Sequence, residues 1–268
     1  MVRVDVALAE AGLARSRNQA AALVEANRVF IDGRAARKAS QDVPEGAKLV
    51  VLEAVDYVSR AGHKLAKALD AFGSLEVVGK QALDVGSSTG GFTDVLLRRG
   101  ANHVIAIDVG HDQLVSELRG NPRVTSIEGF NARELRPESL KTILGRPAPE
   151  IELVVADLSF ISLTLVLDGM VSVAPGADFV LLVKPQFEAG KKSLNAHGIV
   201  TDHRSRAEAI EQVAEHAEKL GLRIVDLVRS ELPGTHGNIE YVLWMSANQG
   251  EYLSQWKERI AVLTKEAR

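Results

Sequence analysis

The chain has 268 residues, of which 46% are hydrophobic and 25% are charged, a composition typical of a globular protein with a sizeable core. Its 32 Lys and Arg residues against 35 Asp and Glu residues give a net charge of −3, which excludes a uniformly basic coat but allows a local basic patch. Because the chain has no cysteine, disulfide frameworks, thiolate nucleophiles and cysteine-based zinc sites are excluded, and a reducing cytoplasm fits.

Neither a targeting segment nor a membrane span is expected. The most apolar region, residues 153–183, is interrupted by Asp157, Asp168, Pro175, Gly176 and Asp178, whereas a spanning helix needs about 20 mostly apolar residues. Aromatic residues make up only 4% of the chain, so surfaces for stacking single-stranded nucleic acid are expected to be few.

Residues 1–53 form the first predicted domain, a small α+β module. Helices and then short strands are expected in this order: residues 4–13, a helix after Ser16, residues 29–31, a tight turn at Asp32-Gly33, and residues 48–52. Gly12 is a helix-ending glycine, and Gln19 follows Ser16 at the spacing of a capping box.

Basic residues gather around the second helix and the turn after Phe30 of this module. Over residues 1–53 there are eight basic and seven acidic residues, so the net excess is small. The group consists of Arg15, Arg17, Arg28, Arg34, Arg37 and Lys38. Phosphates bind such a group because each contact releases condensed counterions, although a solvated surface of mixed charge explains the pattern equally well.

Nearly the whole module resembles the S4 RNA-binding domain, over the stretch RVDVALAEAGLARSRNQAAALVEANRVFIDGRAARKASQDV. In that family the two-helix surface and the following β-turn lie on structured RNA, which is recognised mainly by shape and backbone. The resemblance implies that RNA is contacted by Arg3, Arg15, Arg17, Arg28, Arg34, Arg37 and Lys38.

A predicted linker at residues 54–58 leads to a second domain at residues 59–268. Apolar strand-like runs alternate there with helices, at residues 82–85, 104–108, 153–157, 179–184, 222–228 and 239–245. The clearest helix is amphipathic, spans residues 204–220 and is closed by Gly221. This alternation predicts an α/β fold, a mostly parallel Rossmann-like sheet with helices on both faces.

Charged residues stand at the ends of four of these strands, namely Asp84, Asp108, Asp157 and Lys184. Ligands of parallel sheets bind outside the carboxyl ends of the strands. One charged residue at such a place is ordinary, but four that converge on one edge of the sheet predict a site.

The stretch DVGSSTGGFT after the first of these strands is a candidate cofactor loop. Its glycines let the backbone turn sharply and approach a ligand. The dinucleotide pattern requires a glycine where Ser88 stands, and the acid Asp84 suits a ligand with an ammonium and a sulfonium better than a pyrophosphate. Asp108 follows 24 residues later, the usual place of a ribose-binding carboxylate.

The sequence therefore predicts S-adenosylmethionine as the cofactor rather than NAD. The predicted cofactor-binding residues are Asp84, Gly86, Ser87, Ser88, Thr89, Gly90, Gly91, Phe92 and Asp108. The alternative is a glycine turn that caps a helix and binds no ligand.

Two lysines and two acids are candidates for catalysis. Lys184 follows five apolar residues, so its ammonium is expected to be partly desolvated, which favours the neutral amine. Asp157 ends a neighbouring strand, Glu240 opens the last strand, and Lys64 lies in a helix-like stretch. Each has an ordinary alternative as a helix cap, a strand-edge charge or a solvated side chain, and Lys184 is the hardest to explain that way.

The segment from Ser59 onward resembles the FtsJ-like ribose 2′-O-methyltransferases, and the joined chain resembles the TlyA family, called haemolysin A in older naming. The matching stretches, in chain order, are SRAGHKL, LDVGSSTGGFTDVLL, DLSFISL, LVKPQFE and GNIEY. The family has an Arg and a Trp in its linker, where this chain reads Ala54-Val55-Asp56-Tyr57-Val58. Linker-mediated control is therefore not implied.

The resemblance implies methylation of cytidine 2′-hydroxyls in small- and large-subunit ribosomal RNA, with a catalytic tetrad at Lys64, Asp157, Lys184 and Glu240. A ribose hydroxyl is a poor nucleophile, and a lysine held by carboxylates can accept or orient its proton. We expect Lys184 to contact the hydroxyl, Asp157 and Glu240 to align Lys184, and Lys64 to support the tetrad. No metal is required.

The expected partners are ribosomal RNA or ribosomal subunits, and we expect a cytoplasmic monomer. A second hypothesis is a non-catalytic RNA-binding assembly factor that keeps the fold as a scaffold, which would not need the four charged residues. A pore-forming toxin is disfavoured because no lytic amphipathic helix is visible. An NAD-dependent oxidoreductase is disfavoured by Ser88.

Overall fold

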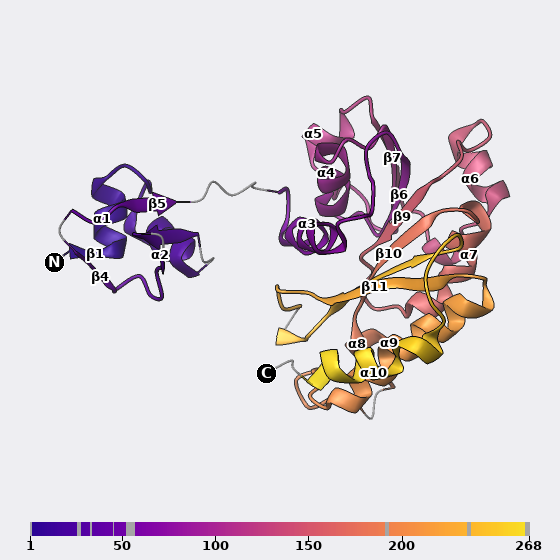
Figure 1. The fold of residues 1–268 in the computed structure, drawn as a ribbon. Helices are drawn as coiled ribbons and strands as arrows, with labels where there is room; N and C mark the ends of the chain where they lie inside the picture. Colours follow the sequence, from indigo (N-terminus) through magenta and orange to yellow (C-terminus); the bar gives the residue numbers. More distant parts are fainter. Residues whose placement is uncertain are drawn as a thin grey trace. The chain divides into compact units, whose positions relative to one another are not determined.

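A computed structural model of the protein describes residues 2–25, 28–32, 34–44, 46–51, 57–190, 193–234 and 237–265. The chain divides into two units, residues 1–56 and residues 57–268 (Figure 1). Separate clusters of buried apolar side chains lie in the two units, so each has the core of a domain.

The N-terminal unit packs two helices with short antiparallel strands. Its described elements are β1 (Val2–Arg3), α1 (Val4–Glu10), α2 (Arg17–Glu25), β2 (Val29–Ile31), β3 (Arg34–Ala35), β4 (Asp42–Val43) and β5 (Leu49–Val51). Strand β2 pairs with both β3 and β5, and β1 pairs with β4. Leu8, Val24 and Val29 are among the side chains that fill its core. The regularly spaced apolar side chains of the two helices therefore face inward.

The helix-ending glycine and the N-cap serine of this unit are confirmed, although the first helix ends at Glu10 and Gln19 accepts from the N–H of Arg15 rather than that of Ser16. Gly12 has a φ of +70° just beyond α1, the left-handed conformation that glycine adopts at helix ends. The Ser16 hydroxyl accepts a hydrogen bond from the backbone N–H of Gln19 at 3.2 Å, as a helix N-cap does. Asp32 has a φ of +49° in the tight turn between β2 and β3, and Gly33 lies outside the described residues.

The second unit is built on one seven-stranded sheet, in the order β11-β12-β10-β9-β6-β7-β8. Its strands are β6 (Gln81–Val85), β7 (His103–Asp108), β8 (Val124–Glu128), β9 (Leu153–Ala156), β10 (Asp178–Val183), β11 (Arg223–Arg229) and β12 (Tyr241–Ser246). Strands β6 to β10 pair in parallel, while β12 is antiparallel to both of its neighbours. The predicted mostly parallel sheet is confirmed, and β8 is a strand that the sequence analysis missed.

Helices cover both faces of this sheet (Figure 1). They are α3 (Arg60–Phe72), α4 (Gly91–Arg98), α5 (Ser116–Arg119), α6 (Pro137–Leu144), α7 (Leu167–Val173), α8 (Pro185–Glu188), α9 (His203–Lys219) and α10 (Leu253–Lys265), with 3-10 turns at Ala132–Glu134 and Leu163–Leu165. Side chains of β6 alternate between two clusters. Leu83 belongs to the cluster that includes side chains of α7, α9 and α10, whereas Ala82 belongs to the cluster that includes side chains of α3 and α4.

The chain reverses its direction of travel through the sheet beside β6. From β6 it proceeds through β7 to β8, and it then returns to β9 on the other side of β6. The loops after β6 and β9 therefore diverge at their carboxyl ends, which is where ligands bind in open α/β sheets.

Tyr57 and Val58, the first residues described after the gap at residues 52–56, belong to the second unit. The backbone N–H of Val58 donates to Asp94 Oδ2 at 3.1 Å, and the Tyr57 ring lies 5.2 Å from the guanidinium carbon of Arg98 and 5.1 Å from the His63 ring. These contacts join two residues of the predicted linker to α3 and α4, while residues 54–56 lie outside the described residues. In the described part of the chain, no helix is long and apolar enough to span a bilayer.

Candidate active site

The loop between β6 and α4 brings backbone against the loop that follows β9. Gly86 has a φ of +84°, and a Cβ there would lie 2.8 Å from Leu158 Cδ2 and 2.9 Å from the Asp157 carbonyl oxygen. Ser88 has a φ of +47°, so this serine adopts the left-handed conformation for which the dinucleotide pattern uses glycine.

Asp84 is fully buried beneath this loop. Its Oδ2 accepts a hydrogen bond from Thr93 Oγ1 at 2.6 Å, while its Oδ1 is buried with no hydrogen-bond donor among the described residues. Burial, together with the nearby charges of Asp157 and Asp108, raises the pKa of Asp84 to about 7. A cationic ligand group nearby would favour its ionised form, so the site fits a cofactor that carries an ammonium.

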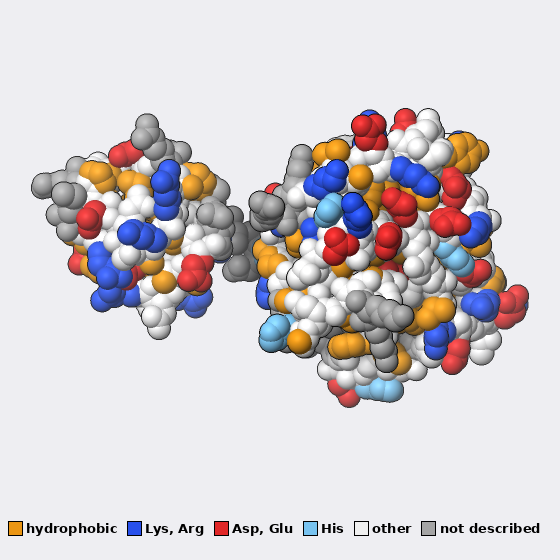
Figure 2. All heavy atoms as spheres, turned by 90° about the horizontal axis from the view of Figure 1, so that it is seen from below, with side chains coloured by type: hydrophobic (Ala, Val, Ile, Leu, Met, Phe, Trp, Pro, Cys, Tyr) orange, Lys and Arg blue, Asp and Glu red, His pale blue; other side chains and the backbone are white. Residues whose placement is uncertain are grey.

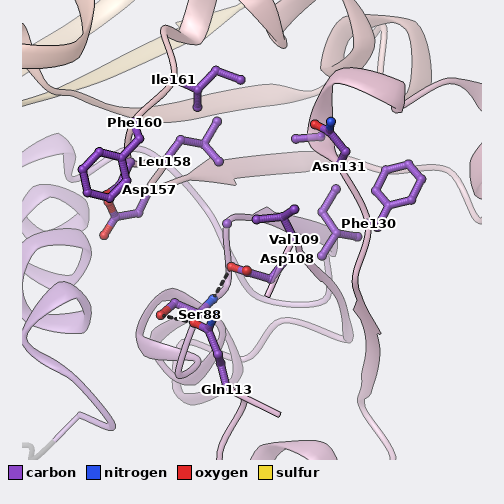
Figure 3. Close-up of a pocket in the computed structure, with 14 residues that line it drawn as sticks. Ser88, Asp108, Val109, Gln113, Phe130, Asn131, Asp157, Leu158, Phe160 and Ile161 are labelled. Carbon is purple, nitrogen blue, oxygen red and sulfur yellow. Dashed lines mark hydrogen bonds between the residues drawn. The ribbon is translucent and has the colours of Figure 1, made fainter. Parts of the chain in front are cut away.

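Asp108 ends β7 with its carboxylate fixed by backbone donors. Oδ2 accepts from the N–H of Ser88 at 2.8 Å, and Oδ1 accepts from the N–H of Gly110 at 2.7 Å. Figure 3 shows the carboxylate beside Ser88 and Gln113 at the edge of the cavity. Each carboxylate oxygen has a second lone pair that can accept from a ribose hydroxyl.

A cavity of about 400 Å³ opens between these loops. In Figure 3, Asp157, Leu158, Phe160 and Ile161 flank it on one side and Phe130 and Asn131 on the other. Its full lining is Gly86, Ser88, Ile107, Asp108, Val109, Gln113, Phe130, Asn131, Ala132, Asp157, Leu158, Ser159, Phe160 and Ile161. Apolar walls with a few carboxylate and amide groups are what a nucleoside requires.

The predicted cofactor residues do not all face this cavity. Gly86, Ser88 and Asp108 line it, Asp84 and Ser87 are buried, and Thr89 is exposed. The remaining three pack into the domain. A Cβ at Gly90 would lie 2.3 Å from Leu118, one at Gly91 would lie 2.2 Å from Ser59 Oγ, and Phe92 is a core side chain. These three residues pack α4 closely against the rest of the domain and do not line the cavity.

Lys184 and Asp157 form a close ion pair at the ends of neighbouring strands. Lys184 Nζ lies 2.6 Å from Asp157 Oδ1 and donates to Ser159 Oγ at 2.9 Å. The lysine is only 8% exposed, because it follows the buried strand β10 and precedes α8. Asp157 and Ser159 both line the cavity, so the ammonium is held beside it.

Glu240 and Lys64 form a second ion pair. Lys64 Nζ lies 2.6 Å from Glu240 Oε2, and Gln186 Nε2 donates to Glu240 Oε1 at 3.1 Å. The expectation that Glu240 aligns Lys184 is therefore not the observed arrangement, because the contacts of its two oxygens are with Lys64 and Gln186. In the register of β10 and β12, Val183 pairs with Tyr241, which places Lys184 and Glu240 next to each other beyond that pair.

An exposed aromatic ring stands at the mouth of the cavity. Phe160 is 91% exposed and has a φ of +66°, a conformation that is rare for a bulky residue. Its ring lies 5.2 Å from the Phe187 ring, and Lys184 Nζ lies 5.8 Å from that same ring. Such strain is found where a side chain is held in place for function.

The basic residues of the N-terminal unit differ in their partners. Arg3 and Arg17 both pair with Asp5 at 3.0 Å, and their hydrogen bonds lower the pKa of Asp5. Arg15, Arg37 and Lys38 are exposed, Arg28 is half-buried, and the side chain of Arg34 lies outside the described residues. Figure 2 shows Lys and Arg side chains across the middle and lower part of this unit's face, with acidic side chains nearer its margins.

Comparisons with known proteins cover most of the chain. Residues 57–247 match the model of the FtsJ-like methyltransferases, and residues 2–49 match the S4 domain. The 16S/23S rRNA (cytidine-2′-O)-methyltransferase TlyA of Mycobacterium tuberculosis is 48% identical over 255 residues, which cover 94% of this chain and 92% of that protein.

The chain belongs to the TlyA family of FtsJ-like methyltransferases. The 23S rRNA (cytidine-2′-O)-methyltransferase TlyA of Campylobacter jejuni is 33% identical, over 87% of this chain and 95% of that protein. A solved structure described as a hemolysin from Streptococcus thermophilus has a TM-score of 0.72 and 35% identity, and covers 99% of this chain and 95% of that one.

For this TlyA-family chain, sequence reasoning missed several residues of the cavity wall. Two loops contribute these residues, Val109 and Gln113 after β7 and Phe130 and Asn131 after β8. The second loop was not predicted because the strand pattern of β8 is weak. Phe160 lies within the quoted stretch DLSFISL but was not singled out. In the described part of the chain, no group of three or more His, Asp and Glu side chains is placed to hold a metal ion.

Proposed function

We propose that the protein is an S-adenosylmethionine-dependent methyltransferase that acts on cytidine 2′-hydroxyls of ribosomal RNA. The observation that carries the proposal is the Lys184–Asp157 pair, 2.6 Å apart, beside the cavity that Asp108 and the glycine loop also line. A proton-accepting group thus lies next to a nucleoside-sized cavity. The names of the TlyA relatives support cytidine in 16S and 23S RNA as the substrate.

The cofactor would be held by the β6 and β7 loops. Asp108 would bind the ribose hydroxyls, Gln113 and Asn131 would offer amide groups to the base, and the buried charge of Asp84 would stabilise the ammonium. When bound, S-adenosylmethionine supplies a methyl group on a sulfonium sulfur, which the ribose oxygen can displace.

Lys184 would take the proton of the hydroxyl. In its neutral form Nζ would present a lone pair to the hydroxyl, while its hydrogen bond to Ser159 and the nearby Asp157 carboxylate hold Nζ in place. After the transfer the new ammonium lies 2.6 Å from the Asp157 carboxylate, which stabilises its charge in a site shielded from water. Lys64 and Glu240 complete the tetrad as a second, internally neutral pair.

Phe160 would hold the acceptor nucleotide, and the N-terminal unit would bind RNA through its own basic side chains. The exposed Phe160 ring beside the cavity offers an unpaired base a surface for stacking. Arg15, Arg37 and Lys38 would contact phosphates, since their side chains are exposed. We infer a protein that acts as a monomer in the cytoplasm, where its RNA substrate is made into ribosomes.

The second candidate is an RNA-binding assembly factor that has the fold without the activity. Against it stands the cost of burying charge, because Lys184 and Glu240 are both more than 90% shielded from solvent. A buried ion pair is often no more stabilising than apolar residues of the same volume. A scaffold without catalysis would therefore have no reason to keep two such pairs.

The test is transfer of a labelled methyl group to ribosomal RNA by purified protein. We expect label in 2′-O-methylcytidine with the intact chain and none with Lys184→Ala. Cofactor and RNA binding, measured on the same samples by calorimetry, should be nearly equal for the two proteins. RNA binding without methyl transfer by the intact chain, on free RNA and on both ribosomal subunits, would favour the assembly factor.

A further inference from the structure

The short helix α8, which follows β10, carries an amide that contacts Glu240 just before β12. Gln186 stands two residues after Lys184, and Pro185 at the first helical position fixes the backbone between them. The amide nitrogen donates to Glu240 Oε1 at 3.1 Å, whereas the amide oxygen is buried without a hydrogen-bond donor among the described residues. An unpaired buried amide oxygen costs about 1–3 kcal/mol, so a stronger requirement fixes this orientation.

That requirement is the Glu240 carboxylate. Its Oε2 takes the Lys64 ammonium at 2.6 Å, and its Oε1 is left for the amide. A Cβ at Gly234 would lie 1.9 Å from Oε1, so the backbone there closes the carboxylate from another side. With Glu240 only 2% exposed, water cannot replace a missing donor, and turning the amide over would set two oxygens against each other.

We propose that Gln186 is a positioning residue that keeps the Glu240 carboxylate directed at Lys64, an inference that rests on the proposed function of the site. With Glu240 so held, Lys64 stays paired with its own carboxylate partner. Lys184 is then the lysine left to exchange a proton with the ribose hydroxyl. The helix that follows Lys184 thereby fixes the geometry of the other half of the tetrad.

The decisive variant is Gln186→Glu, which keeps the size of the side chain and replaces the amide donor by a group that titrates. When the new carboxyl is protonated, its O–H can donate to Glu240 as the amide does. When it ionises, two carboxylates face each other at about 3.1 Å, which disfavours the doubly charged state. The two carboxylates then share a proton or move apart, and Lys64 loses its fixed partner.

We expect the ratio of variant to wild-type single-turnover rates, measured at saturating cofactor and RNA from pH 5.5 to 9, to fall as pH rises. The ratio should be within about threefold of unity at the lowest pH. Above the pKa of the introduced carboxyl it should fall by up to tenfold per pH unit. KM for RNA should change less than threefold. A ratio that does not vary with pH would overturn the proposal, because a merely structural defect has no such titration.

Two further variants complete the test. Gln212→Glu places the same charge on an exposed position of α9 and should leave the ratio flat at unity. Gln186→Met keeps the volume without a donor and should lower the turnover about tenfold at every pH with unchanged KM, and it decides the matter if Gln186→Glu does not fold. Normal turnover by Gln186→Met would also overturn the proposal, whereas absence of methyl transfer by the wild type would instead contradict the proposed function.

Discussion

The methyltransferase unit holds its key charges buried or half-buried and paired one to one, whereas the S4 unit leaves most of its basic side chains exposed. Lys184 and Lys64 each have a single carboxylate partner at 2.6 Å. In the S4 unit Arg15, Arg37 and Lys38 are exposed. Chemistry at one oxygen atom requires fixed geometry, while contact with a phosphate backbone requires only local charge. Single substitutions should therefore act very differently in the two units.

The largest effect is expected at Lys184. Lys184→Ala removes the proposed proton acceptor and should lower the turnover by about 10³-fold, within the range of general acid–base catalysis. Single-turnover assays with labelled cofactor measure this, with cofactor affinity as the control. A loss below about tenfold would show that Lys184 does not take the proton.

The second pair separates catalysis from stability. Glu240→Leu leaves the Lys64 ammonium, whose side chain is only 10% exposed, without its partner and should destabilise the unit by about 3 kcal/mol. The double variant Lys64→Met with Glu240→Leu should regain most of that stability in urea unfolding, yet should stay at least tenfold slower in turnover. Recovery of both properties would mean that this pair only fills space.

Asp84 should make cofactor binding depend on pH. Because its pKa is raised to about 7, a proton must leave before the carboxylate can stabilise a cation. Affinity should therefore rise up to tenfold per pH unit between pH 5.5 and 7, and then level off. In Asp84→Asn the affinity should be about tenfold weaker at pH 7.5 and flat below it, as measured by calorimetry.

The same group makes a contribution of known sign to the pH dependence of stability without cofactor. Its folded pKa lies above its unfolded value near 3.8, so the stability it contributes is present below that value and is lost as pH rises toward about 7. Asp84→Asn should weaken this decline. Equal pH slopes of the unfolding free energy for wild type and Asp84→Asn over this range would contradict the burial of Asp84.

Phe160 should affect substrate binding more than turnover. Phe160→Ala removes an exposed ring beside the cavity, and base–aromatic stacking contributes about 1–3 kcal/mol. KM for RNA should rise about tenfold while the rate at saturation changes by less than threefold. Leu165→Ala, at another exposed apolar residue, is the matched control and should change neither value.

The smallest effects are expected in the S4 unit. Arg15→Ala and Lys38→Ala should each weaken RNA binding about two- to fivefold and reduce the slope of log affinity against log salt by about one. Arg17→Ala should also destabilise the unit, because Arg17 pairs with Asp5. Equal salt slopes for wild type and the Arg15→Ala Lys38→Ala double variant would remove this surface from the RNA interface.

Much of the fold could be predicted because apolar strands and glycine turns are local signals. Residues 82–85 and 104–108 were expected as strands, and they lie in β6 and β7. Strand β8 was missed because its sequence, VTSIE, is short and half polar at the edge of the sheet. The cavity residues that follow it, Phe130 and Asn131, were missed with it.

The residue types of the candidate site could be predicted, but its pairing could not. Asp157 and Lys184 end parallel neighbours, so their approach follows from the strand order. The partner of Glu240 depends on α3, which brings Lys64 across 176 residues of sequence, and on Gln186, whose role no local pattern reveals. Gly91 and Phe92 were assigned to the cofactor because a glycine loop looks the same whether it faces a ligand or a helix.

The most direct test of the central claim is a map of ribose methylation in ribosomal RNA from cells that lack this protein, complemented with wild type or with Lys184→Ala. We predict that one or more 2′-O-methylcytidines disappear without the protein, return with the wild type and stay absent with the variant, although the variant accumulates to the same level. Identical methylation maps in all these cells, or full restoration by Lys184→Ala, would contradict the account.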